Sequence, residues 1–363
     1  MHKFKDHTYG FKTQFDPDTG LYIRSNVLDE NGKDSGAEPF MAEMPHLLDI
    51  GIMGHCIHGA SGLCVQAGVQ CYQDGLNINQ PNMPLRDYQG IIDQCKGAVC
   101  QVALGGRGDP DMHEDFEALL AYTREAGIVP NMTTSGYGLT PQKARWIRQY
   151  CGAAAVSWYR SEYTDKAINL LLDAGVHTNV HFVLGRQSLE EAIAIIEGKK
   201  IPPGIGRMIF LLHKPVGLGQ KRNVLDILDP RVRHFFSLFN DADNCRIAGF
   251  DSCCVPGLLN MALKIHTASM EPCEGGRFSA YVTPDLQLLP CSFDQKQRWG
   301  VSLRNLSLRE AWNSDQFEAF RNVMRARCPD CTLKEYCLGG CPVVPEIVLC
   351  GMIRGGNKNE NQD

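Results

Sequence analysis

Short apolar segments alternate six times with longer amphipathic segments between residues 46 and 243. The apolar segments have the length of buried strands, and the amphipathic segments have the period of helices. This alternation predicts an α/β fold in which a parallel sheet curls into a partial (β/α)6 barrel of the TIM type. The expected strands are 46–54, 99–106, 129–136, 153–160, 177–185 and 207–213. The expected helices are 84–97, 111–127, 141–151, 163–175, 188–199 and 229–243.

The chain divides into four segments by this pattern. Residues 1–45 are polar and rich in turn residues, which predicts an irregular lead-in or a hairpin. Residues 46–243 form the expected barrel, with its chemistry at the carboxyl ends of the strands. Residues 244–352 are loop-rich and dense in cysteine, so we expect a small iron–sulfur or other metal-binding domain there. Residues 353–363 form a polar tail that we expect to be disordered.

Charge and hydropathy exclude several classes of function. The formal net charge is −5 with both signs interspersed, whereas a nucleic-acid-binding protein would show a basic excess. No run of 18 apolar residues is present to span a bilayer, and the N-terminus has no apolar stretch typical of a signal peptide. We therefore expect a cytoplasmic protein with neither a nucleic-acid nor a membrane partner.

Sixteen cysteines are the most informative part of the composition. Disulfide-dense proteins are usually small and exported, and this chain is large and has no export signal. Clustered cysteines in such a chain more often bind metal. Scattered, buried thiols are the alternative, because free cysteine packs as a small apolar side chain.

The first cysteine group lies in a glycine-rich loop directly after the first expected strand. Its members are Cys56, Cys64 and Cys71. Three thiolates can hold three irons of a 4Fe–4S cluster and leave the fourth iron open to a small ligand. A zinc site with His55 and His58 is the alternative, although zinc favours closer cysteine pairs. We expect the two histidines to be solvent-facing loop residues.

The second cysteine group lies near the C-terminus and is more closely spaced. It reads Cys328-x2-Cys331-x5-Cys337-x3-Cys341 and is followed by Cys350. Spacing of this kind argues for a bound metal, and zinc and iron–sulfur both remain open on the residues alone.

The first group and its surroundings resemble the radical S-adenosylmethionine (SAM) enzymes. That family places three cysteines after its first strand, the last followed by an aromatic residue, as in Cys71–Tyr72. The family usually has three and then two residues between these cysteines, whereas this chain has seven and then six. The segment Gly105–Pro110, GGRGDP, resembles the family's GGxGEP motif with Asp109 in the acidic position.

This resemblance implies a set of SAM-contacting residues at the ends of the strands. Thr134–Gly136 stands where the family often has a TNG-like run, and Ser157 ends the fourth strand. Val183 lies in the fifth strand, near the family's adenine-contacting motif. The implied set is Tyr72, Gly105, Gly106, Gly108, Asp109, Ser135, Ser157 and Val183.

The C-terminal spacing resembles the SPASM extension, which usually holds two further 4Fe–4S clusters. The resemblance implies three clusters in all. The distal cluster would be held by Cys328, Cys331, Cys337 and Cys350. The proximal one would be held by Cys273, Cys291, Cys341 and Cys254, with Cys253 as the alternative to Cys254. Leu286 replaces a glycine that the extension usually has, within an expected hairpin. The remaining cysteines are expected to be structural thiols.

The family activity implies an enzyme that cleaves SAM reductively to a 5′-deoxyadenosyl radical, which takes a hydrogen atom from a substrate. A peptide or protein side chain is the expected substrate, and a small metabolite is the alternative. A flavodoxin or ferredoxin would supply the electron. A non-enzymatic zinc or electron-transfer protein is the remaining alternative.

Two details refine the peptide-modifying hypothesis. Only about 45 residues precede the first strand, too few for the complete leader-binding domain of many relatives, about 80–90 residues long. Sulfatase-maturing relatives have an aspartate directly after the second auxiliary cysteine, whereas here Asp294 follows Cys291 by three positions. Asp294 is thus a displaced candidate for the catalytic base, and an exposed aspartate in a turn is the competing interpretation.

Overall fold

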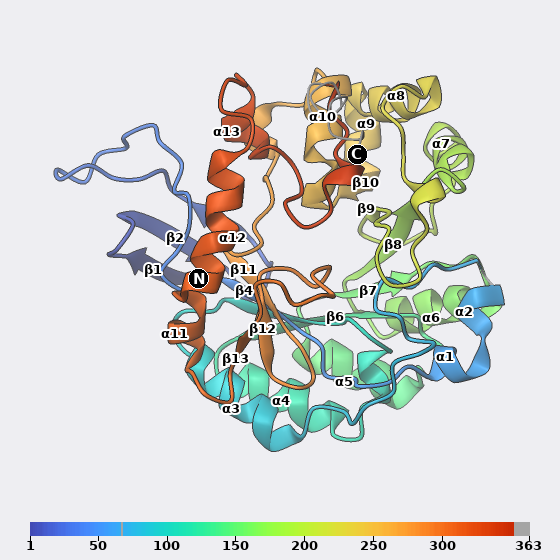
Figure 1. Cartoon of the computed structure of the whole chain (residues 1–363). Coiled ribbons are helices and arrows are strands. Elements are labelled where there is room, and N and C mark those ends of the chain that lie inside the picture. The colour runs from blue at the N-terminus through green and yellow to red at the C-terminus, as the bar shows by residue number, and fades with distance from the viewer. Residues whose placement is uncertain (67, 352–363) are drawn as a thin grey trace, which may run out of the picture.

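The computed structural model describes residues 1–66 and 68–351, and its centre is a curved sheet of ten strands (Figure 1). The strand order is β10-β9-β8-β7-β6-β5-β4-β11-β12-β13. All neighbours from β10 to β11 are parallel, and β12 and β13 complete the sheet in antiparallel orientation. The strands are β4 Leu47–Ile50, β5 Gln101–Leu104, β6 Val129–Thr134, β7 Ala154–Ser157, β8 Thr178–Leu184, β9 Met208–Leu212, β10 Ala248–Phe250, β11 Ser279–Val282, β12 Gln287–Leu289 and β13 Val301–Ser302.

Helices follow the strands and cover the outer face of the sheet, as Figure 1 shows for α3 to α6. The six are α3 Leu85–Cys95, α4 Phe116–Glu125, α5 Pro141–Tyr150, α6 Glu162–Asp173, α7 Leu189–Gly198 and α8 Pro230–Ser237. The expected strands correspond to β4 to β9 and the expected helices to α3 to α8, so the α/β partial barrel is confirmed. A seventh parallel strand, β10, was not expected, because three residues carry too little periodicity to predict a strand.

Alternation along each strand decides which side chains face the interior of the barrel. In β4, Leu48 and Ile50 are fully buried in the core beneath the helices. Asp49 lies between them and therefore points to the opposite, inner face. Its partners in the neighbouring strands are Ala103 of β5 and Tyr281 of β11. A carboxylate and a phenol thus stand side by side on the inner wall.

The C-terminal region continues the barrel sheet, because β11 pairs in parallel with β4. The expected boundary at 243/244 lies between β9 and β10, which are neighbours in this sheet, so a division there remains a prediction. The β11–β12 turn contains Leu286 at φ +69°, a conformation that favours glycine. The remaining helices of this region are α9 Ala242–Ile247, α10 Val255–Met261, α11 Leu308–Trp312, α12 Asp315–Ala326 and α13 Lys334–Cys337.

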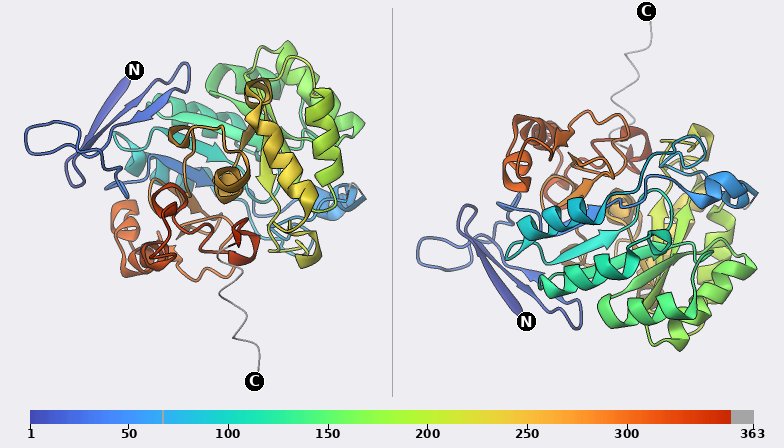
Figure 2. Two further views of the ribbon diagram at one scale, coloured as in Figure 1. Left: turned by 90° about the horizontal axis from the view of Figure 1, so that it is seen from above. Right: turned by 90° about the horizontal axis from the view of Figure 1, so that it is seen from below.

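The N-terminal segment forms a separate antiparallel sheet of β1 His2–Asp6, β2 Phe11–Phe15 and β3 Tyr22–Arg24. The expected hairpin is therefore present, with a third strand added. Arg24 fixes this sheet to the C-terminal region through Glu271 at 3.0 Å and the Phe278 ring at 3.8 Å. Figure 2 shows β1–β3 at one end of the molecule and helices α1 and α2 at the other. The expected disordered tail, 353–363, lies outside the described residues.

Candidate functional site

The loop after β4 carries the first cysteine group on two short helices, α1 Ile57–Ser61 and α2 Leu63–Gln66. Cys56 precedes α1, and Gly62 ends α1 in the left-handed conformation. A Cβ atom added at Gly75 would lie 3.5 Å from Cys56 Sγ and 3.8 Å from Cys71 Sγ. The structure therefore brings Cys56 and Cys71 together beside Gly75. Cys64 Sγ lies 3.8 Å from the carbonyl oxygen of His58.

The glycine-rich loop after β5 packs directly on this cysteine loop. Arg107 donates to the carbonyl oxygens of Gln73 at 3.2 Å and Gly54 at 3.3 Å. Gly108 has φ +68°, and a Cβ there would lie 2.5 Å from the carbonyl oxygen of His55. A side chain at this position would push the two loops apart. Gly105, in contrast, faces open space, with no atom within 4 Å of an added Cβ.

Asp109 and Ser135, from two different loops, are hydrogen-bonded to each other. Asp109 Oδ1 accepts from the Ser135 backbone N–H at 2.7 Å, and Oδ2 accepts from the Ser135 hydroxyl at 2.5 Å. His58 joins them, with Nε2 2.6 Å from Ser135 Oγ and 3.3 Å from Asp109 Oδ2. The expectation that both histidines face solvent is thus wrong for His58, which is only 4% exposed, whereas His55 is exposed. No local sequence signal distinguishes the two.

The other expected SAM contacts lie on the same edge of the sheet. Ser157 ends β7, and Val183 of β8 is 46% exposed although both its neighbours are buried or intermediate. Tyr72 packs against Phe293, with ring centroids 4.4 Å apart. Gly106 lies under the Tyr281 hydroxyl, which would be 2.6 Å from an added Cβ. Tyr72 thus joins the first cysteine loop to the C-terminal region.

Four cysteines of the C-terminal region influence one another electrostatically and form the proximal group. A hydrogen bond with Cys341, and then burial, raise the pKa of Cys253 well above its ordinary value. Burial raises the pKa of Cys273 to about 12, and the Cys253 thiol adds to the rise. Burial also raises the pKa of Cys291, with Cys273 and Cys253 contributing.

Cys254 is adjacent to Cys253, whose thiol adds to the rise in its pKa, but Cys254 makes its hydrogen bonds outside this group. Its Sγ lies 3.2 Å from Asp251 Oδ1 and 4.0 Å from the carbonyl oxygen of Phe210, and the residue is fully buried. The structure therefore favours Cys253 over the expected Cys254 as the fourth member of the proximal group. The sequence could not decide between Cys253 and Cys254. They are adjacent residues of one short 3-10 helix and differ only in the direction in which their side chains point.

The distal group forms around helix α13. Burial raises the pKa of Cys337, and three neighbouring thiols contribute to the rise. These thiols belong to Cys328, Cys331 and Cys350. All sixteen cysteines lie in the described part of the chain, and none of them forms a disulfide there. The four members expected from the sequence are thus together and reduced.

The three cysteine groups do not form a compact single-ion site in the described part of the chain. Among the described residues, no three Cys, His, Asp or Glu side chains converge closely enough to hold one metal ion. A zinc ion needs four ligands around one point. The ligands of a 4Fe–4S cluster stand farther apart, because each thiolate binds a different iron.

Asp294 is buried, not an exposed turn residue, with 1% of its surface accessible. Its Oδ2 accepts from the Trp299 backbone N–H at 3.2 Å, and Oδ1 lies 3.5 Å from Arg298 Nε. Both oxygens therefore hold the turn that follows Cys291. This arrangement gives Asp294 a structural part in positioning the turn.

Two other ionisable groups, Lys214 and Asp49, lie outside the motifs. Lys214 pairs with Asp251, and its Nζ lies 4.4 Å from the centre of the Phe293 ring. Burial alone would lower the pKa of the Lys214 ammonium. The Asp251 carboxylate, together with the Cys253 and Cys254 thiols, has the larger effect and raises this pKa. On the inner wall, burial and then Glu274 raise the pKa of Asp49 to about 7. Sequence analysis missed both groups, because neither belongs to a motif.

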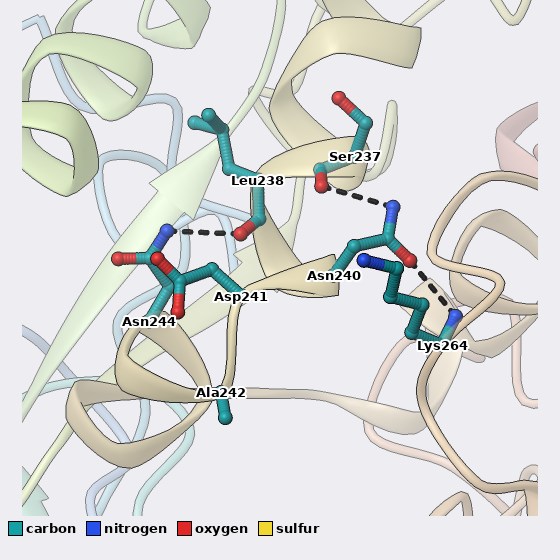
Figure 3. A pocket seen from close by; sticks show the side chains of 7 residues that line it. All are labelled: Ser237, Leu238, Asn240, Asp241, Ala242, Asn244 and Lys264. Atoms are coloured by element: carbon teal, nitrogen blue, oxygen red, sulfur yellow. Dashed lines mark hydrogen bonds between the residues drawn. The ribbon is translucent and has the colours of Figure 1, made fainter.

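A surface hollow near the end of α8 is unrelated to the cysteine groups (Figure 3). Asn240 donates to the carbonyl oxygen of Ser237 at 3.0 Å and accepts from the backbone N–H of Lys264 at 2.8 Å. Asn244 donates to the carbonyl oxygen of Leu238 at 2.9 Å. These hydrogen bonds connect neighbouring turns of the chain.

Comparison with known proteins places the cysteine-rich region in a family. Residues 273–332 match the SPASM model, an iron–sulfur cluster-binding domain. Fe-coproporphyrin III synthase of Methanosarcina barkeri is 22% identical over 46% of this chain and 48% of that protein. PqqA peptide cyclase of Methylocella silvestris is 24% identical over 64% of this chain and 67% of that protein.

Solved structures show the same fold over most of the chain. SuiB of Streptococcus suis, bound to S-adenosylmethionine, has a TM-score of 0.64 at 19% identity and covers 86% of this chain and 78% of that one. The protein anSMEcpe with bound AdoMet has a TM-score of 0.59 at 14% identity and covers 82% of this chain and 86% of that one. The chain thus carries a SPASM iron–sulfur domain and is similar to radical SAM enzymes that have one.

The SPASM match covers only part of the C-terminal cysteines. Cys273, Cys291, Cys328 and Cys331 lie inside the matched residues, whereas Cys337, Cys341 and Cys350 follow them. Cys253, which hydrogen-bonds to Cys341, precedes the matched residues. No helix among the described residues is long and apolar enough to cross a bilayer.

Proposed function

We propose that this enzyme cleaves SAM reductively at the Cys56–Cys64–Cys71 loop and uses the resulting 5′-deoxyadenosyl radical to take a hydrogen atom from a peptide or protein side chain. The observation that carries the proposal is the junction of the two loops. There the Cys56 and Cys71 thiols lie together, and the glycine-rich loop with Asp109 packs directly on them. A 4Fe–4S cluster with one open iron supplies one-electron reduction of the SAM sulfonium when it is bound.

The chain's own residues would bind and orient SAM. Asp109 would accept hydrogen bonds from the amine of the methionine part, and Ser135 holds its carboxylate in place. Gly105 leaves room for the ligand beside the loop. The other proposed contacts are Tyr72, Gly106, Gly108, Ser157 and Val183.

We propose that two sets of four cysteines each hold one auxiliary 4Fe–4S cluster. With the cluster of the SAM loop, the enzyme would then contain three 4Fe–4S clusters. Cys253 replaces Cys254 in the proximal set because its thiol contacts Cys341. The proximal set is Cys253, Cys273, Cys291 and Cys341. The distal set is Cys328, Cys331, Cys337 and Cys350. In this proposal the enzyme works in the cytoplasm, where a flavodoxin or ferredoxin would donate the electron.

The relatives support a peptide substrate. One is a PqqA peptide cyclase, and SuiB has been solved with its precursor peptide SuiA at a TM-score of 0.63. A small-molecule substrate is the second candidate, because the other curated relative is an Fe-coproporphyrin III synthase. We expect no catalytic part for Asp294, since both of its oxygens are used in the turn.

The substrate class is tested with short peptides encoded next to this gene. The anaerobically reconstituted enzyme is incubated with SAM, a reductant and each peptide, and the peptide mass is followed. A cross-link or a side-chain oxidation lowers the mass by two hydrogens, and 5′-deoxyadenosine forms in step with it. Unchanged masses of all peptides, with 5′-deoxyadenosine still forming, would contradict a peptide substrate and favour a small metabolite.

A further inference from the structure

The loop that follows β9, residues 213–220, packs on the first cysteine loop and carries a buried lysine. The Leu218 backbone N–H donates to the carbonyl oxygen of Cys71 at 2.8 Å. A Cβ at Gly217 would lie 2.4 Å from the carbonyl oxygen of Tyr72, so a side chain there would push the two loops apart. Near the start of this loop is Lys214, whose side chain is only 3% exposed.

Lys214 is held by two residues that flank members of the proximal group. Its ammonium pairs with Asp251, which stands two positions before Cys253. Its Nζ also lies 4.4 Å from the centre of the Phe293 ring, and Phe293 stands two positions after Cys291. The face of an aromatic ring attracts a cation, so both contacts hold the ammonium in place. A fixed positive charge therefore lies beside two segments that carry proximal cysteines.

The two ends of this ion pair face different cysteines. Asp251 Oδ1 lies 3.2 Å from Cys254 Sγ. The other oxygen, Oδ2, accepts from the Leu212 backbone N–H at 3.2 Å and from the Lys214 ammonium. The carboxylate is thus directed at Cys254, which we leave outside the proximal set, and the ammonium lies on the other side of the carboxylate.

The ionisation of the thiols reflects the same arrangement. A hydrogen bond with a neighbouring thiol raises the pKa of Cys253, and Lys214 opposes this rise more than Asp251 adds to it. Burial raises the pKa of Cys291, and Lys214 opposes that rise as well. At Cys254, burial and then Asp251 raise the pKa, and Lys214 has the smaller, opposing effect. The ammonium therefore stabilises negative charge chiefly at the proximal group.

We propose that Lys214 sets the reduction potential of the proximal cluster, because its buried positive charge stabilises the reduced, more negative form and so raises the potential. This inference rests on the proposed proximal set of cysteines. Reduction adds one negative charge to a cluster, and the charges around a cluster are among the factors that set its potential. Salt screens a buried charge much less than an exposed one, so the effect of Lys214 persists at physiological ionic strength.

The test compares the cluster potentials of Lys214→Met, Lys214→Arg and Lys143→Met with those of the wild type. Lys214→Met removes the charge, and Lys214→Arg keeps it. Lys143 is the matched control, because it pairs with another buried aspartate, Asp111, at 3.4 Å. Each anaerobically reconstituted protein is titrated with titanium(III) citrate while the electron paramagnetic resonance signals are recorded. The proximal signal is the one that disappears in Cys253→Ala.

We expect Lys214→Met to make reduction of the proximal cluster about tenfold less favourable, which lowers its potential by about 59 mV. The potentials of the other clusters should not change. Lys214→Arg should keep the wild-type proximal potential, because the charge remains, and Lys143→Met should keep all potentials.

Lys214→Met also leaves Asp251 without its partner, which destabilises the fold. The double variant Lys214→Met/Asp251→Asn removes both charges and avoids this. Its proximal potential should still lie below the wild-type value, since the ammonium acts on the proximal group more strongly than the carboxylate does.

A wild-type proximal potential in either variant, at full iron content, would overturn the inference. So would a loss of iron from the double variant, since Lys214 would then serve the assembly of the cluster and not its potential. If no signal disappears in Cys253→Ala, the proposed assignment of the proximal cluster fails, and the inference fails with it.

Discussion

Cys253 and Cys254 are neighbours in sequence, but their thiols have different surroundings. Cys253 hydrogen-bonds to Cys341 in the proximal group, whereas Cys254 contacts Asp251 and the backbone of Phe210. On the proposed assignment, a cluster ligand and a structural thiol are adjacent, so each serves as the control for the other.

We expect Cys253→Ala to lose about four of the roughly twelve irons that three 4Fe–4S clusters contain. Cys254→Ala should keep its full iron content, because its thiol lies outside the proximal group. Iron and sulfide per chain after anaerobic reconstitution give the answer. A larger loss from Cys254→Ala would reverse the assignment.

Asp49 stands on the inner wall of the barrel with a pKa raised from 3.8 to about 7 by burial and by Glu274. An unfolded aspartate ionises near pH 4, so between about pH 4 and 7 the folded chain binds more protons than the unfolded one. Protonated Asp49 therefore contributes to the free energy of unfolding at low pH. This contribution is lost as the pH rises toward 7.

We expect Asp49→Asn to stabilise the enzyme more at pH 8 than at pH 5. At pH 8 the variant avoids the cost of a half-buried carboxylate, which is at most about 4 kcal/mol for a shift of this size. The free energy of unfolding in urea is measured for both proteins at both pH values. An equal difference at the two pH values would show that Asp49 ionises normally.

At the scale of elements, the short helix α1 depends on a close approach of two backbone segments. A Cβ at Gly59 would lie 1.9 Å from the carbonyl oxygen of Gly75, and the Cys56 and Cys71 thiols lie beside that same residue. Gly90 in α3 has no atom within 4 Å of an added Cβ.

We expect Gly59→Ala to displace α1 and to lower the iron bound by the first cysteine loop. Gly90→Ala should leave the iron unchanged and stabilise the protein by about 0.5–1 kcal/mol, because alanine is the better helix former. The iron content and the thermal unfolding of both variants are measured to test these expectations. Normal iron in Gly59→Ala would mean that the loop can adjust.

The sequence was sufficient for elements that depend on local pattern. Strands β4 to β9 and helices α3 to α8 follow from periodicity, since each buries a continuous apolar face. The pairing of β11 with β4 joins residues that are far apart in the chain, and no local pattern encodes it. The partners of His58 also come from two other loops. Contacts between segments that are distant in the chain therefore determine the β11–β4 pairing and the surroundings of His58, and local sequence patterns do not reveal such contacts.

At the scale of the whole molecule, the C-terminal region is part of the barrel. Beyond the β4–β11 pairing, Trp312 Nε1 donates to the carbonyl oxygen of Ala42 at 2.9 Å, and Arg277 donates to that of Phe40. The Tyr72–Phe293 contact connects the first cysteine loop to the turn after Cys291. The cysteine groups are thus held in one framework.

We expect a chain that ends at residue 243 to be insoluble or to aggregate. It lacks β11, so the edge of β4 and the apolar side chains beneath it are exposed. Solubility and size-exclusion chromatography test this against the full chain. A soluble, monomeric fragment with the helix content of the barrel would show that the barrel folds independently.

The formation of 5′-deoxyadenosine, measured together with iron content, tests the central claim most directly. With SAM and dithionite, the reconstituted enzyme should bind about twelve irons and release 5′-deoxyadenosine. The Cys56/Cys64/Cys71 triple alanine variant should bind about eight irons, keep its auxiliary clusters and release none. Continued SAM cleavage by the triple variant, or stoichiometric zinc and no cleavage in the wild type, would contradict the account.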